Sequence, residues 1–240
     1  MPAATFESNP ERLRQRTLAP ATTARFRAAI VAIAPAVLFV ALTYHPPLPG
    51  RQPNVEALAG AVNADVTRWG LSHLAIGVAS GLVVLAFLAI HGYLRDNGEG
   101  RWSALALPFI VMGSTLFTML PAMEFAPLAA ARTGGDVPAA QAALQPWFVP
   151  ILAIGAISFA IGVLGFARGI ARSGVLGRQL TWLVITALVI MAATRFIPFT
   201  AAQLYVQGTA GIAALWPLAQ RMAAHTQPRP TEQPPPMPAT

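Results

Sequence analysis

Long apolar runs are the feature of this sequence that most restricts its fold. A helix rises about 1.5 Å per residue, so roughly 20 apolar residues are needed to cross a hydrocarbon core about 30 Å thick. Because that core offers the backbone no hydrogen-bond partners, such runs predict an all-α, polytopic membrane helix bundle. Five runs are long enough or nearly so, at about residues 26–45, 71–94, 103–125, 147–168 and 179–199.

A sixth run, at about residues 203–221, is a weaker candidate for a membrane span. Glutamine, glycine and proline interrupt it, so this segment either crosses the membrane or lies in the interface. We therefore expect six transmembrane helices, with five as the alternative. The interrupting residues are Gln203, Gln207, Gly208, Gly211 and Pro217.

The charges of the chain predict its orientation. Only 10% of the residues are charged, too few for a soluble surface, and all sixteen basic residues are arginine. Short cytoplasmic segments of membrane proteins are enriched in basic residues. With six spans and a cytoplasmic N-terminus, twelve arginines lie inside and four outside. With five spans, ten lie inside and six outside. This favours six spans in the cell membrane, with lipids and not nucleic acid as the partner of the basic residues.

Three regions are expected along the chain. Residues 1–24 are predicted to be a disordered, basic, cytoplasmic N-terminus, and residues 25–222 the transmembrane domain. Residues 223–240 form a tail rich in proline and polar residues, which cannot pack a core and favours extended conformations. We expect a solvated tail, with a protein-binding segment as the alternative.

Part of the sequence repeats at an offset of 78 residues. Trp69 aligns with Trp147, and Gly77 with Gly155. The match predicts a parallel duplication of a helical hairpin, in which spans 2–3 and 4–5 form a pseudosymmetric four-helix bundle. The segment before each copy is expected to form a short helix that leads to an interfacial tryptophan, over residues 54–66 and 136–144.

Two GxxxG patterns occur within the apolar runs, at Gly77 with Gly81 and at Gly165 with Gly169. Glycines at this spacing let two helices approach closely in a membrane. We expect them to pack helices within one chain, with a protein partner on these faces as the alternative.

Ionisable groups at membrane depth are costly and therefore candidates for function. His73 and His91 share a helix face, but they are eighteen residues and about 27 Å apart, so they cannot share a site. If the spans alternate in direction, four polar residues lie near the outer ends of spans 1, 2, 3 and 5. This candidate outer-face cluster consists of His45, His73, Glu124 and Arg195.

Several interpretations of this cluster remain open. Interfacial histidines in contact with headgroups and water are favoured. Glu124 and Arg195 are expected either to form an ion pair or to leave the arginine reaching the headgroups by itself. The alternative is a metal, since two histidines and one carboxylate, here His45, His73 and Glu124, are a ligand set for zinc or non-haem iron. No tight motif spacing supports that set. A haem between His45 and His73 is a further alternative.

Other side chains add little to the chemistry. Met112, Met119 and Met123 lie on one helix face, where core packing is favoured over a Cu(I) site. The chain has no cysteine, no lysine, no phosphate-binding glycine loop and no GxSxG motif. These absences exclude thiolate sites, lysine Schiff bases and the common serine hydrolases.

The sequence accordingly predicts an integral membrane protein without a recognisable catalytic motif and without a bound cofactor. A small transporter-like, ligand-binding or accessory subunit is favoured. The alternative is a membrane enzyme or metal-binding protein with its site at the outer ends of spans 1, 2, 3 and 5, and a scaffold that acts through its tails is a third class. Substrate and oligomeric state are not indicated.

Overall fold

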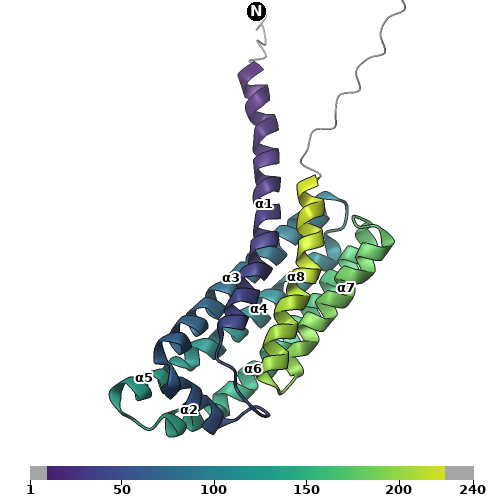
Figure 1. Cartoon of the computed structure of the whole chain (residues 1–240). Helices are drawn as coiled ribbons and strands as arrows, with labels where there is room; N and C mark the ends of the chain where they lie inside the picture. The colour runs from purple at the N-terminus through teal and green to yellow at the C-terminus, as the bar shows by residue number, and fades with distance from the viewer. Residues whose placement is uncertain (1–9, 225–240) are drawn as a thin grey trace, which may run out of the picture.

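The computed structural model describes residues 10–224, which are helical throughout apart from short connections and contain no strand. The prediction of an all-α helix bundle is confirmed. The elements, labelled in Figure 1, are α1 (Pro10–Tyr44), α2 (Val55–Ala64), α3 (Val66–Asp96), α4 (Arg101–Met123), α5 (Phe125–Thr133), α6 (Val137–Ser173), α7 (Arg178–Ala193), the 3-10 turn η1 (Thr194–Phe196) and α8 (Thr200–Ala224).

Five of the described helical segments are long and apolar enough to cross a membrane, and they coincide with the five predicted runs. They are Thr22–Tyr44, Val66–Asp96, Arg101–Thr133, Val137–Ser173 and Arg178–Phe196. The weaker sixth run forms α8, whose 25 residues extend over about 37 Å. Because α8 lies alongside α1 and α7, it occupies the same layer as the other long helices (Figure 1), which supports the six-span arrangement.

The six long helices form a ring in the order α1, α3, α4, α6, α7, α8, and α8 closes the ring against α1. The expected four-helix bundle of spans 2 to 5 does not form, because α7 packs on α6 and α8 rather than on α3. One end of the ring carries α2 and α5 (Figure 1) and is called the α2–α5 end below. The other end, where residues 97–100 join α3 to α4, is called the α3–α4 end.

The two copies of the proposed repeat differ in their surroundings. Trp69 is fully buried, whereas Trp147 is 69% exposed, so only Trp147 lies at the surface as expected. The predicted short helix over residues 54–66 is present as α2, capped by the Asn54 side chain. Residues 137–144 instead belong to α6, because Asp136 caps a helix that continues without a break into the long apolar run. The duplication itself stays a prediction.

Glycines bring α4 and α6 into backbone contact, and this contact is called the α4–α6 seam. A Cβ on Gly113 would lie 2.5 Å from the Phe159 nitrogen, and one on Gly162 would lie 2.8 Å from the Ile110 nitrogen. A Cβ on Gly165 would likewise lie 2.6 Å from the Cβ of Ala106. The second GxxxG pattern therefore packs within the chain, as expected.

The first GxxxG pattern does not make a close helix contact. A Cβ on Gly77 would meet only a Thr118 methyl group at 3.7 Å, and one on Gly81 would meet nothing within 4 Å.

The prediction of core methionines is also wrong for Met112 and Met119, which are 44% and 43% exposed on the outside of the ring.

The described part of the chain also corrects the predicted boundaries of the terminal regions. Helix α1 begins at Pro10, within the segment 1–24 that was expected to be disordered. Proline is favoured in the first turn of a helix, and the residues that follow, among them Glu11 to Arg16, are good helix formers. Residues 1–9 and 225–240 lie outside the described range, and most of the proline-rich tail is among them.

Candidate metal centre and adjoining cavity

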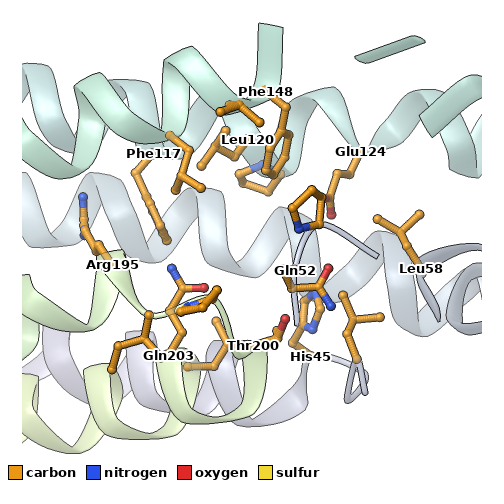
Figure 2. A pocket seen from close by; sticks show the side chains of 18 of the residues that line it. His45, Gln52, Leu58, Phe117, Leu120, Glu124, Phe148, Arg195, Thr200 and Gln203 are labelled. Carbon is orange, nitrogen blue, oxygen red and sulfur yellow. The ribbon is translucent and has the colours of Figure 1, made fainter. Parts of the chain in front are cut away.

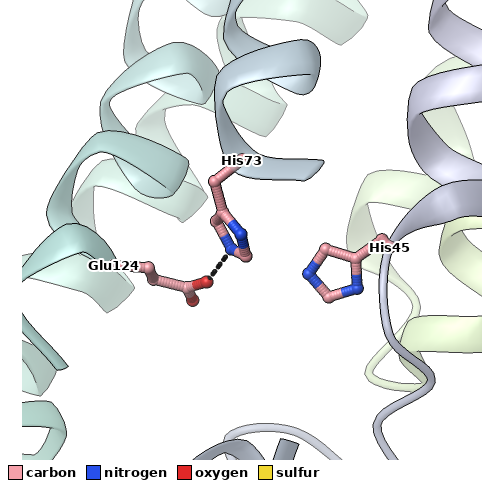
Figure 3. A group of neighbouring side chains, drawn as sticks. All are labelled: His45, His73 and Glu124. Atoms are coloured by element: carbon pink, nitrogen blue, oxygen red, sulfur yellow. Dashed lines mark hydrogen bonds and ion pairs between the residues drawn. The ribbon is translucent and has the colours of Figure 1, made fainter. Parts of the chain in front are cut away.

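Three of the four predicted site residues converge at the α2–α5 end. His45 follows the end of α1, His73 lies in the second turn of α3, and Glu124 separates α4 from α5. One ligand atom from each side chain lies within 4.8 Å of those of the other two (Figure 3), and all three residues are buried. The two histidines are only 6% and 3% exposed, so their interpretation as interfacial side chains in contact with water is wrong.

A backbone carbonyl determines the tautomer of His45. Its Nδ1–H donates a hydrogen bond of 2.7 Å to the carbonyl of Pro46, which leaves the Nε2 lone pair free. A neutral ring with Nε2 free in this way is the state in which an imidazole binds a metal.

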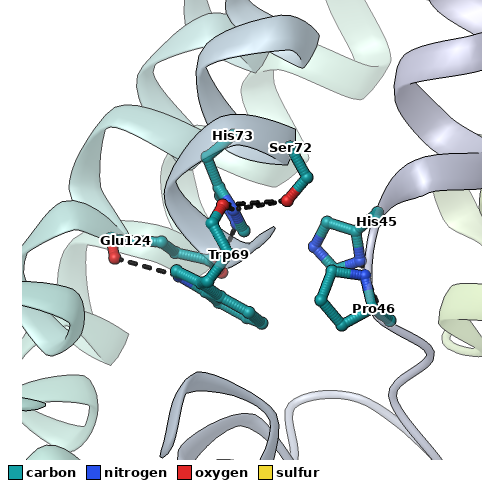
Figure 4. Close-up of polar contacts among 6 residues, drawn as sticks. All are labelled: His45, Pro46, Trp69, Ser72, His73 and Glu124. Atoms are coloured by element: carbon teal, nitrogen blue, oxygen red, sulfur yellow. Dashed lines mark hydrogen bonds and ion pairs between the residues drawn. The ribbon is translucent and has the colours of Figure 1, made fainter. Parts of the chain in front are cut away.

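His73 is oriented in the same manner from within α3. Its Nδ1–H donates to the carbonyl of Trp69 at 2.6 Å, and the Ser72 hydroxyl donates to that carbonyl at 2.8 Å (Figure 4). The other ring nitrogen, Nε2, is hydrogen-bonded to Oε2 of Glu124. Both histidines thus direct Nε2 toward the carboxylate, while a main-chain oxygen binds Nδ1.

The break between two helices positions Glu124. Its backbone nitrogen still bonds to the Leu120 carbonyl, as in the last turn of α4, before α5 begins at Phe125. Its own carbonyl accepts a hydrogen bond of 3.3 Å from the indole Nε1 of Trp69. The carboxylate is consequently held beside His73.

Trp69 connects all three residues, a role that the sequence did not indicate. Its indole bonds to Glu124, its carbonyl bonds to His73, and its ring centroid lies 4.3 Å from that of His73 and 5.3 Å from that of His45. The only signal in the sequence was its position four residues before His73, which places the two on one helix face.

This arrangement fits a metal such as zinc or iron. Histidines that bind metals commonly donate their second ring N–H to a carbonyl or carboxylate, as both do here. Two donors bound to zinc at about 2.1 Å in tetrahedral geometry lie about 3.4 Å apart, so shifts of about 1 Å would bring the three ligand atoms to bonding distance. A haem does not fit, because the rings of His45 and His73 are only 5.0 Å apart, too close to admit a porphyrin between them.

A cavity of about 350 Å³ adjoins the three residues inside the ring (Figure 2). Its walls are mainly apolar, with contributions from Phe117, Leu120, Phe148 and Leu152. Buried atoms without a hydrogen-bond partner add polarity, and among the described cavity-lining residues these are Nε2 of Gln52, Oε1 of Gln141, Oε1 of Gln145 and Nε of Arg195. A mainly apolar cavity with a few convergent polar groups is typical of a small-molecule site.

The fourth predicted residue, Arg195, lines this cavity but does not pair with Glu124. In Figure 2 the two lie at opposite sides of the cavity, and the carboxylate of Glu124 is bonded to His73. Nη1 of Arg195 donates instead to the carbonyl of Gly113 at 3.4 Å. The predicted ion pair is therefore wrong. Arg195 lies in the turn η1, which directs its side chain toward Gly113 in the α4–α6 seam and away from the α2–α5 end, where the carboxylate of Glu124 lies.

His91 lies far from the site, as its spacing from His73 predicted. Its Nδ1 is 2.9 Å from the hydroxyl of Ser103 at the α3–α4 end.

No protein family, curated protein or solved structure matches this chain, so its function is inferred from the site itself.

Proposed function

We propose that this chain is a membrane metalloprotein that binds one divalent cation of the zinc or iron class through His45, His73 and Glu124. The observation that supports this most directly is the pair of histidine tautomers. Each ring gives its Nδ1–H to a main-chain carbonyl. Nε2 of His73 is bonded to Glu124, and Nε2 of His45 is turned toward the same two side chains (Figure 3). Such orientation is expected of metal ligands.

The arginine distribution supports placing this site at the outer face of the cell membrane. With a cytoplasmic N-terminus, the α2–α5 end lies outside. The chain contains no cysteine, so a single introduced cysteine can report on each end. Thr133→Cys at the α2–α5 end should react with an impermeant thiol reagent added to intact cells, whereas Asn97→Cys at the α3–α4 end should not. The reverse pattern would contradict the orientation.

Three protein ligands leave at least one coordination position of a zinc-class ion for water or a ligand molecule. The adjoining cavity gives a small molecule access to that position. The described cavity-lining residues include no acid or histidine outside the three ligands, so a metal-bound water is the nucleophile that this site would supply. We therefore favour metal-assisted chemistry on a small molecule over a purely structural metal.

Metal analysis of the purified protein tests this proposal. After loading with Zn²⁺ and desalting, the protein should retain about one ion per chain, and Glu124→Gln should lower this sharply. The Co²⁺-loaded protein should show visible d–d bands that shift on addition of azide, which occupies an open position. Failure of the wild-type chain to retain Zn²⁺, Fe²⁺ or Co²⁺ would contradict the proposal.

The direct hydrogen bond between His73 and Glu124 supports a second, metal-free function. In that case the imidazole and the carboxylate share a proton beside the cavity, and the chain is a ligand-binding or transporter-like protein. Absence of bound metal together with ligand binding that depends on Glu124 would favour this function.

A further inference from the structure

Arg195 is a buried cation without an acidic partner among the described residues. The side chain is 5% exposed, and its guanidinium carbon lies 3.6 Å from the ring centroid of Phe159 and 4.2 Å from that of Phe117. Among the described residues its one hydrogen bond is the long contact with Gly113, and Nε has no partner. The two aromatic faces stabilise the cation in part, but a charge at membrane depth without an anionic partner is costly, and such residues commonly mark the binding site of an ion or substrate.

The guanidinium lies deeper in the bundle than the three proposed metal ligands. Its contacts on α4 are Gly113 and Phe117, which precede Glu124 by eleven and seven residues. At about 1.5 Å per residue these contacts lie about 16 and about 10 Å below the carboxylate along the helix. The cavity thus has a cationic deep end and a metal-binding outer end.

Apolar side chains form the wall between the two ends. On α4 the cavity is lined by Phe117 and Leu120, and on α6 by Phe148 and Leu152. A small inorganic anion would leave these surfaces uncovered, whereas the apolar part of a longer molecule would cover them.

The cavity reaches the outside of the ring between α6 and η1. Val149 and Phe196 both line the cavity, and they are 49% and 55% exposed. Helix α7 gives way to η1 at this level and α8 begins only at Thr200, so α6 extends beyond its neighbour toward the α2–α5 end (Figure 1). The outside of a ring of apolar helices faces lipid, so this opening is lateral.

We infer that the cavity binds a lipid-soluble amphiphile with a carboxylate group, which enters from the membrane between α6 and η1 and pairs with Arg195. A carboxylate matches the planar guanidinium in geometry, and its charge compensates that of the arginine. The remainder of the molecule lies against the apolar walls and leads toward His45, His73 and Glu124. Only this last step rests on the proposed metal site, since the pairing with Arg195 needs no metal.

Binding of decanoate to the full chain in phosphatidylcholine nanodiscs tests this inference. Decanoate should bind at least about tenfold more tightly than decanol, which lacks the charge, and than acetate, which lacks the chain. Arg195→Gln should remove the preference for decanoate over decanol, and Arg195→Lys should restore part of it. The matched control is Arg168→Gln, because Arg168 also stacks on an aromatic ring, Trp102 at 4.8 Å, but lies away from the cavity.

Three outcomes would overturn the inference: equal affinities for decanoate and decanol, tight binding of acetate, or an unchanged preference in Arg195→Gln. If Arg195→Gln does not fold, the comparison of the three probes on the wild-type chain still decides the matter.

Measuring decanoate binding to metal-free His45→Ala separates the proposed metal site from the carboxylate site at Arg195. Retained decanoate binding there supports the arginine site whether or not the wild-type chain binds metal. Loss of binding there would contradict the inference that pairing with Arg195 needs no metal.

Lateral access has a test of its own. Val149→Trp should slow decanoate association severalfold by narrowing the opening. Ile157→Trp, at a 52% exposed position on the same helix that does not line the cavity, should leave association unchanged. Equal association rates for both variants would place the opening elsewhere and contradict access from the membrane.

Discussion

The α2–α5 end and the α3–α4 end of the ring carry similar residue types in very different surroundings. Each end has a histidine on α3, a tryptophan and at least one carboxylate. At the α2–α5 end, His73 and Glu124 are buried beside a cavity and bonded to each other. At the α3–α4 end, His91 is bonded to a serine, and Asp96 forms an exposed ion pair of 2.7 Å with Arg27.

The difference shows that composition does not distinguish a site from a solvated helix end. What distinguishes them is the cap formed by α2, α5 and the chain before α2, which buries two histidines and a carboxylate together beside a cavity. At the α3–α4 end Glu99 is also buried, but His91 is only partly buried and no described histidine bonds to that acid. Buried polar groups need defined partners, and exposed ones exchange theirs with water at little cost. The α2–α5 end is therefore the one at which substitution should alter ligand binding.

The largest expected difference between the two ends is in metal binding. His73→Ala should weaken Zn²⁺ binding by more than about a hundredfold, because loss of a second-shell group alone can cost that much. His91→Ala, which changes the same residue type on the same helix, should retain the wild-type affinity. Competition with a chromophoric chelator measures both affinities. A similar loss in His91→Ala would mean that the metal binds elsewhere.

The next effect concerns the α4–α6 seam, which joins the two ends. Gly162→Leu should destabilise the protein by about 3 kcal/mol, because its side chain would overlap the backbone of Ile110. Gly81→Leu, where the space is open, should be neutral or slightly stabilising. Thermal unfolding in detergent distinguishes them, and equal melting temperatures would show that the seam is not close-packed.

A smaller effect is expected from the tryptophans. Trp69→Phe keeps an aromatic ring but removes the hydrogen bond to the Glu124 carbonyl, so Zn²⁺ affinity should fall about tenfold. Trp102→Phe, at the α3–α4 end, should change only stability, by less than about 1 kcal/mol through its contact with Arg168. Unchanged affinity in Trp69→Phe would mean that the indole does not orient the carboxylate.

The smallest effect is expected at the exposed ion pair. Asp96→Asn should cost no more than about 0.5 kcal/mol, and the cost should shrink as salt is added. Unfolding at low and high ionic strength provides the measurement. A loss of several kcal/mol that salt does not alter would show that the α3–α4 end is as buried as the other.

The sequence predicted the fold well because apolar run length is a local property. The five apolar helices follow from their lengths alone, and the short helix α2 was also predicted. The predicted packing was less accurate. The repeat suggested a four-helix bundle, but α1 and α8 complete a ring of six helices, since helix neighbours depend on the summed contacts of all faces.

The residues of the site were likewise predictable, but their pairing was not. Scarcity of ionisable groups at membrane depth identified His45, His73, Glu124 and Arg195. Span direction placed them near one end of the bundle, but not to within a helical turn. Arg195 contacts α4 at Gly113 and Phe117, about two to three turns before Glu124, so the carboxylate bonds to His73 and the predicted ion pair had the wrong partner.

By itself, the sequence determined that this chain is a helical membrane protein, where its spans lie and which few ionisable residues are buried with them, because each of these follows from the cost of placing polar groups in hydrocarbon. Only the tertiary structure decided that Trp69 is buried between His45, His73 and Glu124, that both imidazoles direct Nε2 to one carboxylate, and that Arg195 faces a cavity without an acid beside it. These are contacts between helices distant in sequence. Their distances depend on helix rotation and on the glycine contacts of the α4–α6 seam, and the GxxxG pattern at Gly165 and Gly169 indicated close packing there without identifying the partner helix.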